Sequence, residues 1–125
     1  MSDLGLYLGV ALAGAIGAPA RFLVDTFVQS RHRSTFPFGT LVINASGALL
    51  LGFITGLVLY HTFPRTPQVL LGAGFCGAYT TFSTFTFETA ALAETGERGR
   101  ALLNVVGSVA AGTIAAGVGL ALGAL

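Results

Sequence analysis

GAYTTFSTF, at residues 77–85, interrupts the third of four long apolar segments in this chain. The stretch combines a glycine with several hydroxyl side chains and two phenylalanines three residues apart, which is a poor composition for an uninterrupted membrane helix. Backbone that leaves the helix at membrane depth is tolerated only where protein or a water-filled path surrounds it. Breaks of this kind mark ion and substrate sites in transport proteins. The stretch therefore predicts a protein that moves something small across a membrane, with its site at the break.

The overall composition also indicates a membrane protein. Of the 125 residues, 54% are hydrophobic and 9% are charged, whereas a soluble domain carries about 25% charged residues. Four runs contain no charged residue: Leu4–Ala20, Ser34–Tyr60, Thr66–Phe87 and Ala101–Leu125. Each is close to the roughly 20 residues that cross the hydrocarbon core. We expect an all-α, multi-pass protein of the cell membrane, with residues 1–125 forming a single domain of four transmembrane helices.

Helix start and stop signals refine these segments. Pro64 and Pro67 predict a turn between the second and third helices, because proline removes a backbone donor. The charged stretch Glu94–Arg100 predicts the last loop. The expected helices cover about 4–28, 38–60, 68–93 with a break around 77–81, and 101–122.

Arginine is distributed unevenly between the two ends of the predicted bundle. If the helices alternate in direction, one end holds Arg31, Arg33, Arg98 and Arg100, and the other holds Arg65. An arginine excess favours the cytoplasmic side, which would place both termini outside. The loops are short and the bias is modest, so insertion in both directions stays open.

Four polar residues inside or beside the apolar segments have two readings each. Asn44 forms an inter-helical hydrogen bond or lines a pore as a polar donor. Arg21 either extends to the membrane interface or attracts an anion at a pore mouth. Glu88 is a functional intramembrane carboxylate or lies close enough to water to be solvated. Ser108 is weaker evidence, because a helical serine can bond its own backbone.

No catalytic constellation is present in the sequence. His32 and His61 lie in predicted loops without a nearby cysteine or carboxylate, and the serine-rich break has no acid–base partner. Cys76 is the only cysteine, which rules out a disulfide within one chain. The net charge of +1 and the absence of a basic cluster give no reason to expect nucleic acid as a partner. These features argue against an enzyme.

The break itself suggests how ions could be held. Phe82 and Phe85 lie on one side of a helix, and the positive edge of an aromatic ring beside hydroxyl groups could stabilise a small anion. Carbonyls freed at the end of the first half-helix suit a hard cation. One chain offers too few such ligands, but two chains that meet at the break could enclose one ion.

At this point the chain resembles the Fluc/CrcB fluoride-channel family. Three motifs carry the resemblance, one in each of the first three segments: Gly17-Ala18-x-x-Arg21-Phe22, Pro37-x-Gly39-Thr40-Leu41-x-x-Asn44, and Gly74-Phe75-Cys76-Gly77-x-x-Thr80-Thr81-Phe82-Ser83-Thr84-Phe85. The resemblance implies a fluoride-selective channel that exports fluoride passively from the cytoplasm and so reduces its toxicity. It also implies an antiparallel, dual-topology dimer with two pores at the subunit interface.

The resemblance further assigns roles to residues. Backbone carbonyls of Gly77 and Thr80 from both subunits would hold a structural Na⁺ that is not transported. The fluoride pore would involve Asn44, Phe82, Phe85, Thr81 and Ser83, with Arg21 at a vestibule and Ser108 as a candidate on the fourth helix. Asn104 departs from the family, which often has tyrosine there, and this puts the fourth helix's share of the pore in doubt. The arginine bias leaves a homodimer or a heterodimer with a paired homologue open.

Two other functions remain as alternatives. A small dual-topology multidrug exporter would need a carboxylate deep in the first helix, and Leu4–Ala20 has none. A non-transporting membrane assembly protein would explain the G-x-x-x-G pairs Gly5/Gly9, Gly52/Gly56 and Gly119/Gly123, which allow close helix packing within a chain or in a dimer. It would not explain the polar break, Asn44 and the phenylalanine pair together.

Overall fold

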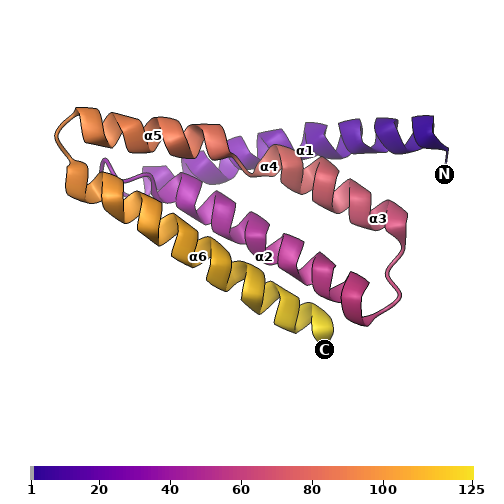
Figure 1. The fold of residues 1–125 in the computed structure, drawn as a ribbon. Helices are drawn as coiled ribbons and strands as arrows, with labels where there is room; N and C mark the ends of the chain where they lie inside the picture. Colours follow the sequence, from indigo (N-terminus) through magenta and orange to yellow (C-terminus); the bar gives the residue numbers. More distant parts are fainter. Residues whose placement is uncertain (1) are drawn as a thin grey trace.

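The computed structural model describes residues 2–125 and is built entirely of helices across this range (Figure 1). Its elements in chain order are α1 (Asp3–Ser30), α2 (Phe38–Tyr60), α3 (Arg65–Val69), η1 (Leu70–Cys76), α4 (Gly77–Tyr79), α5 (Phe82–Glu94) and α6 (Arg98–Ala124). The all-α prediction is confirmed.

The long helices have clear sequence reasons for their ends. Ser2 caps α1 by accepting a hydrogen bond from the Gly5 N–H, as a hydroxyl N-cap does. The bounds of α2 agree with the prediction. α5 ends at Glu94, and the chain turns at Gly96, whose φ of 85° is the left-handed conformation that glycine adopts readily. Because that turn is so tight, α6 begins at Arg98, three residues before the predicted start at Ala101.

The third predicted segment is the irregular one. It begins at Arg65 rather than near Gln68, because Pro67 lies in the first helical turn, where a missing N–H costs little. Residues Leu70–Cys76 then form a π-helix, a wider turn that is rare and often found at functional sites. The break is narrower than predicted, since Gly77–Tyr79 are still helical and only Thr80 and Thr81 leave the helix.

Three helices in the described part of the chain, α1, α2 and α6, are long and apolar enough to cross a membrane. The third predicted segment does not reach this length in one piece, because the interruption after Tyr79 divides it and leaves α5 with 13 residues. The expectation of a multi-pass membrane protein agrees with this arrangement.

Glycines hold α2 against α6. A β-carbon on Gly52 would meet the backbone of Ala116, and one on Gly119 would meet the backbone of Leu49. Gly56 and Gly123 face each other in the same way. Two of the predicted G-x-x-x-G pairs therefore serve packing within the chain, because small residues let the helix backbones come together.

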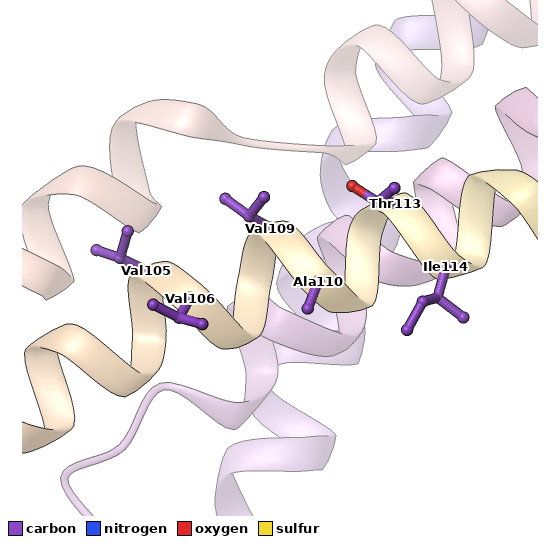
Figure 2. A pocket seen from close by; sticks show the side chains of 6 residues that line it. All are labelled: Val105, Val106, Val109, Ala110, Thr113 and Ile114. Atoms are coloured by element: carbon purple, nitrogen blue, oxygen red, sulfur yellow. The ribbon is translucent and has the colours of Figure 1, made fainter.

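Other glycines on α6 have no neighbour. Gly107 and Gly112 have open space where a β-carbon would lie. On the outward side of the same helix, a shallow groove of about 510 Å³ is lined by aliphatic side chains and Thr113 (Figure 2). Val106, Val109 and Ile114 in this groove are exposed. This side of α6 is free of the rest of the chain.

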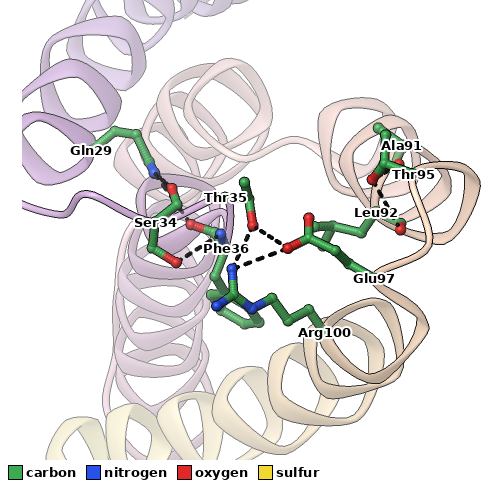
Figure 3. A network of polar contacts seen from close by, with 9 residues as sticks. All are labelled: Gln29, Ser34, Thr35, Phe36, Ala91, Leu92, Thr95, Glu97 and Arg100. Atoms are coloured by element: carbon green, nitrogen blue, oxygen red, sulfur yellow. Dashed lines mark hydrogen bonds and ion pairs between the residues drawn. The ribbon is translucent and has the colours of Figure 1, made fainter.

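The loop between α1 and α2 and the loop between α5 and α6 lie at the same end of the molecule (Figure 1). Thr35 donates a hydrogen bond to Glu97 and accepts one from Arg100, which also pairs with Glu97 at 3.2 Å (Figure 3). The side chain of Gln29 bonds the Phe36 carbonyl and the Gly39 N–H, and so orders the start of α2. The arginine-rich loops are therefore tied together at one end.

Candidate functional site

The break consists of two threonines in extended conformation. Thr80 has φ −80° and ψ 159°, and Thr81 has φ −149° and ψ 122°. The Thr81 hydroxyl accepts a hydrogen bond from the Thr84 N–H at 3.1 Å and so caps α5. A threonine at this position starts a new helix for the same reason that Ser2 starts α1.

Asn44 on α2 bonds both backbone groups of Thr81. Its Nδ2 donates to the Thr81 carbonyl at 2.9 Å, and its Oδ1 accepts from the Thr81 N–H at 2.8 Å. The break leaves the Thr81 N–H without its regular acceptor, which would be costly in a membrane, whereas the Thr81 carbonyl belongs to the N-cap residue of α5 and accepts the Asn44 amide as an additional bond. The Asn44 side chain satisfies both at once. The sequence left two interpretations of Asn44, an inter-helical hydrogen bond or a place in a pore lining. The structure contains the inter-helical hydrogen bond.

The residues around the break also rest on α2. The Tyr79 hydroxyl lies 2.9 Å from the Ser46 hydroxyl, which itself donates to the Ile43 carbonyl. The serine hydrogen is used in that bond, so tyrosine is the donor between the two. Thr80 places its methyl group against Gly47, where a β-carbon would collide with it. Three consecutive residues, 79–81, are therefore held by one surface of α2.

The carbonyl groups of Gly77 and Thr80 are left available by this arrangement. In a continuous helix they would accept from Thr81 N–H and Thr84 N–H. Thr81 donates to Asn44 instead, and Thr84 donates to the Thr81 hydroxyl. Free carbonyl oxygens are the kind of ligand that a hard cation such as Na⁺ takes. Across residues 2–125, no group of three or more acidic, histidine or cysteine side chains could hold a metal instead.

Two cavities flank Thr81. One, of about 190 Å³, lies between α1, α2 and the start of α5, and its polar lining residues are Arg21, Asp25, Thr40, Thr81 and Thr84. The other, of about 250 Å³, is lined by Asn44, Thr80, Thr81 and Phe82 together with Ala48 and Leu51. The structure thus brings Arg21, Asn44 and Phe82, predicted from three separate segments, around one threonine.

A carboxylate faces the same region from α5. Glu88 is half-buried and accepts a hydrogen bond from Thr40, a buried residue of α2 that also lines the smaller cavity. The two interpretations of Glu88, a functional carboxylate and a solvated one, both stay open. The polar surface therefore continues from the break toward the arginine-rich loops.

The two predicted phenylalanines lie beside each other at the start of α5. The ring centroids of Phe82 and Phe85 are 5.8 Å apart, and the rings are tilted by 44°. Phe82 is 77% exposed, so its ring is not packed inside the chain. The Ser83 hydroxyl between them lies 3.3 Å from the Thr81 hydroxyl. Rings and hydroxyls therefore surround the beginning of α5.

Ser108 is separate from this group. It lies on α6 and donates to the side chain of Asn104, at 3.3 Å. Asn104 is 2% exposed and bonds Thr89 on α5. These hydrogen bonds link Ser108 through Asn104 to α5 and do not reach Thr80 or Thr81.

Several residues at the site were not predicted. Thr84 and Thr40 lie in the quoted motifs but were given no role, and Asp25, Ser46 and Tyr79 were not singled out. The spacing of Thr81 and Thr84 is typical of a helix cap and could have indicated that bond. The contact of Ser46 with Tyr79 joins residues far apart in sequence, and no local pattern indicates it.

The comparisons with known proteins agree with the motifs. Residues 8–120 match the family described as "CrcB-like protein, Camphor Resistance (CrcB)". The chain is similar to "Fluoride-specific ion channel FluC 2" of Cutibacterium acnes, with 50% identity over 117 residues, 93% of this chain and 95% of the relative. It is 48% identical over 116 residues to a protein of the same name from Mycobacterium bovis, covering 93% of this chain and 89% of the relative. With "Fluoride-specific ion channel FluC 1" of Streptomyces avermitilis it shares 46% identity over 112 residues, 89% of this chain and 90% of the relative. This chain therefore belongs to the CrcB family.

Proposed function

We propose that this chain is a fluoride-selective channel that lets fluoride leave the cytoplasm passively and so lowers its toxicity. The observation that carries the proposal is the identity of 46–50%, along nearly the whole chain, with relatives named as fluoride-specific ion channels. Membership of this family makes the protein a channel of the cell membrane and not an enzyme. The geometry of the break supports the same function, because it concentrates polar groups between helices.

The proposed assembly is an antiparallel dimer in which the broken segment makes a fourth crossing. α3 to α5 together cover Arg65–Glu94, which is enough chain to cross a membrane even with a break. Gly77 and Phe82 are exposed in the single chain. A second copy against this side would cover both residues and would complete a site that one chain only half supplies.

A structural Na⁺ is proposed where the two breaks meet. The available carbonyls of Gly77 and Thr80 fit this ion, since two chains would supply four oxygen ligands without any carboxylate. When bound, Na⁺ would neutralise the carbonyl ends of the half-helices and fix their positions. The residues of this chain would hold Na⁺ and would not pass it.

The proposed fluoride path begins at Arg21 and continues along the polar lining around Thr81. Fluoride is strongly hydrated, so a selective pore must replace water with hydrogen-bond donors. Hydroxyls of Thr81 and Ser83, the amide of Asn44 and the ring edges of Phe82 and Phe85 are the proposed replacements. None of these groups carries a full charge, so binding stays loose enough for the ion to leave. Arg21 would attract the anion at the mouth.

The driving force needs no coupled reaction. Hydrogen fluoride crosses a membrane as a neutral acid and dissociates at cytoplasmic pH. A membrane potential of about 100 mV, negative inside, then favours exit of the anion by about 2.3 kcal/mol per charge.

The test is fluoride efflux from liposomes that contain only this chain, measured with a fluoride electrode and with chloride efflux as the control. Rapid fluoride release without chloride release is expected. Efflux that appears only after co-expression with a paired homologue would favour a heterodimer. Folded protein that releases no fluoride in either setting would overturn the proposal, and drug efflux by the same vesicles would favour the exporter.

A further inference from the structure

Asn104 is a buried amide that belongs to neither of the cavities beside the break. It is 2% exposed and lies on α6, one turn before Ser108. Its Nδ2 donates to the Thr89 hydroxyl at 2.8 Å, and the Thr89 hydroxyl donates to the Phe85 carbonyl at 2.8 Å. The Ser108 hydroxyl donates to Asn104 Oδ1 at 3.3 Å. Four residues therefore form one chain of hydrogen bonds that ends at Phe85.

The direction of every bond in this chain is determined. The Phe85 carbonyl can only accept, so Thr89 must use its single hydroxyl hydrogen there. Thr89 then accepts from Asn104, which places the amide nitrogen toward α5. The amide oxygen can therefore face only Ser108, which must donate to it. Every bond is therefore donated in the direction from Ser108 to Phe85, and the bond from Asn104 to Thr89 is the one of the three that crosses from α6 to α5.

The position of this chain in the fold gives it mechanical importance. α5 and α6 meet at their shared loop and separate toward the break (Figure 1). Within residues 2–125, the bond from Asn104 to Thr89 is the side-chain hydrogen bond that joins the two helices. The next turn of α5 toward the break carries Phe85. A change in this bond would therefore let the start of α5 move relative to α6.

We propose that Asn104 is a positioning residue for Phe85, acting through Thr89 and not by contact with the ion. The inference rests on the proposed function, in which Phe85 faces fluoride. The proposal also gives Ser108 a role: its hydroxyl donates to the side-chain oxygen of Asn104, Oδ1, and supports the anion path only through this bond. In this proposal α6 contributes to conduction by fixing the orientation of α5.

The experiment is a double-mutant cycle with Asn104→Leu and Thr89→Val, each reconstituted and compared per folded protein for fluoride efflux. Thr89→Val keeps the shape and removes the hydroxyl. Each single variant should lower efflux by about tenfold, the scale of one lost hydrogen bond. The double variant should lower it by about the same factor, because both changes break the same chain. Thr89→Ser keeps the hydroxyl and should retain the wild-type rate.

Two comparisons complete the design. Ser108→Ala leaves the bonds from Asn104 to Phe85 in place and should lower efflux less than Asn104→Leu does. Thr55→Val is the matched control, because the Thr55 hydroxyl is exposed and bonds only the Leu51 carbonyl of its own helix. It should leave efflux unchanged.

Additive losses in the double variant, or a larger loss in Ser108→Ala than in Asn104→Leu, would overturn the proposal, since either would mean that α6 side chains face the ion directly. The same double-mutant cycle is also measured as the midpoint of thermal unfolding in detergent. This second readout distinguishes a failure of the hydrogen-bond proposal from a failure of the proposed function. If the two substitutions have non-additive effects on the midpoint but the protein conducts no fluoride, the hydrogen-bond chain is supported and the proposed function is rejected. If their effects on the midpoint are additive, the hydrogen-bond chain is rejected, whether or not fluoride passes.

Discussion

At the scale of single residues, the site depends on polar groups that replace lost backbone hydrogen bonds. Asn44 is the clearest case, because one side chain serves both the N–H and the carbonyl of Thr81. The same side chain is one of the proposed hydrogen-bond donors to fluoride. Stability and conduction should therefore change together when Asn44 changes, and separately when Phe82 changes.

Asn44→Asp should damage both properties. The carboxylate could still accept from the Thr81 N–H, but it would face the Thr81 carbonyl with a second oxygen and would repel an anion. We expect a loss of about 1–3 kcal/mol in the free energy of unfolding, the cost of an unpaired buried polar group, and a fluoride efflux too slow to measure. Thermal unfolding in detergent and liposome efflux check the two parts. A stable variant with normal efflux would show that Asn44 has neither role.

Phe82→Ile should slow fluoride without unfolding the protein. Phe82 is 77% exposed in the single chain, so little packing is lost with its ring. The ring edge is lost, and with it roughly 1 kcal/mol of interaction, which corresponds to a several-fold decrease in efflux. Phe87→Ile is the matched control, because Phe87 is on the same helix and is 74% exposed. If both variants conduct equally, Phe82 does not face the ion.

At the scale of elements, α2 is the surface on which the break is built. Ser46, Gly47 and Asn44 meet Tyr79, Thr80 and Thr81 in turn. The π-helix before the break shifts the register of the segment, since its bonds run from residue i to i−5. The conformation of the break is thus determined by the neighbouring helix as much as by its own residues.

Gly47→Ala tests this packing. The new methyl group would collide with the Thr80 methyl group and push the break away from α2. We expect a loss of about 1–3 kcal/mol in unfolding free energy, as for other overpacked sites, with slower efflux. Thr80→Ser removes the opposing methyl and should restore much of both in the double variant. Gly107→Ala has open space around it and should leave stability unchanged or slightly higher. Equal effects of the two alanines would reject the contact.

At the scale of the whole molecule, the two ends of the bundle differ in charge and in structure. The arginine-rich loops lie together and are joined through Thr35, Glu97 and Arg100 (Figure 3). The opposite end carries Arg65 and the exposed His61. This asymmetry favours one orientation in the membrane over the other.

The orientation can be measured by cysteine labelling in intact cells. Cys76 is fully buried, so the natural thiol should not react. An antiparallel dimer of this chain alone needs both orientations, so in a Cys76→Ala background His61→Cys and Gly99→Cys should each react in part with a membrane-impermeant maleimide added to intact cells, and fully after the cells are opened. Labelling of His61→Cys alone in intact cells would show one fixed orientation, as the arginine bias favours, and would support a heterodimer with a paired homologue over a homodimer.

The sequence alone was sufficient for the features that depend on local composition. Charge-free runs of membrane length predicted the helices, and the bounds of α2 are confirmed as predicted. Glycine and clustered hydroxyls predicted the break, because threonine can leave a helix and cap the next one. The motifs predicted the family, which the relatives confirm.

The tertiary structure alone decided which groups meet. The sequence contained G-x-x-x-G pairs, but only the crossing of α2 and α6 shows that Gly52 and Gly119 are packed while Gly107 is free. The sequence left two readings for Asn44, and the choice of Thr81 as its partner depends on a contact 37 residues away. Composition acts within a few turns of helix, whereas a buried amide or glycine takes its role from the helix packed against it, which no neighbouring residue in the chain specifies.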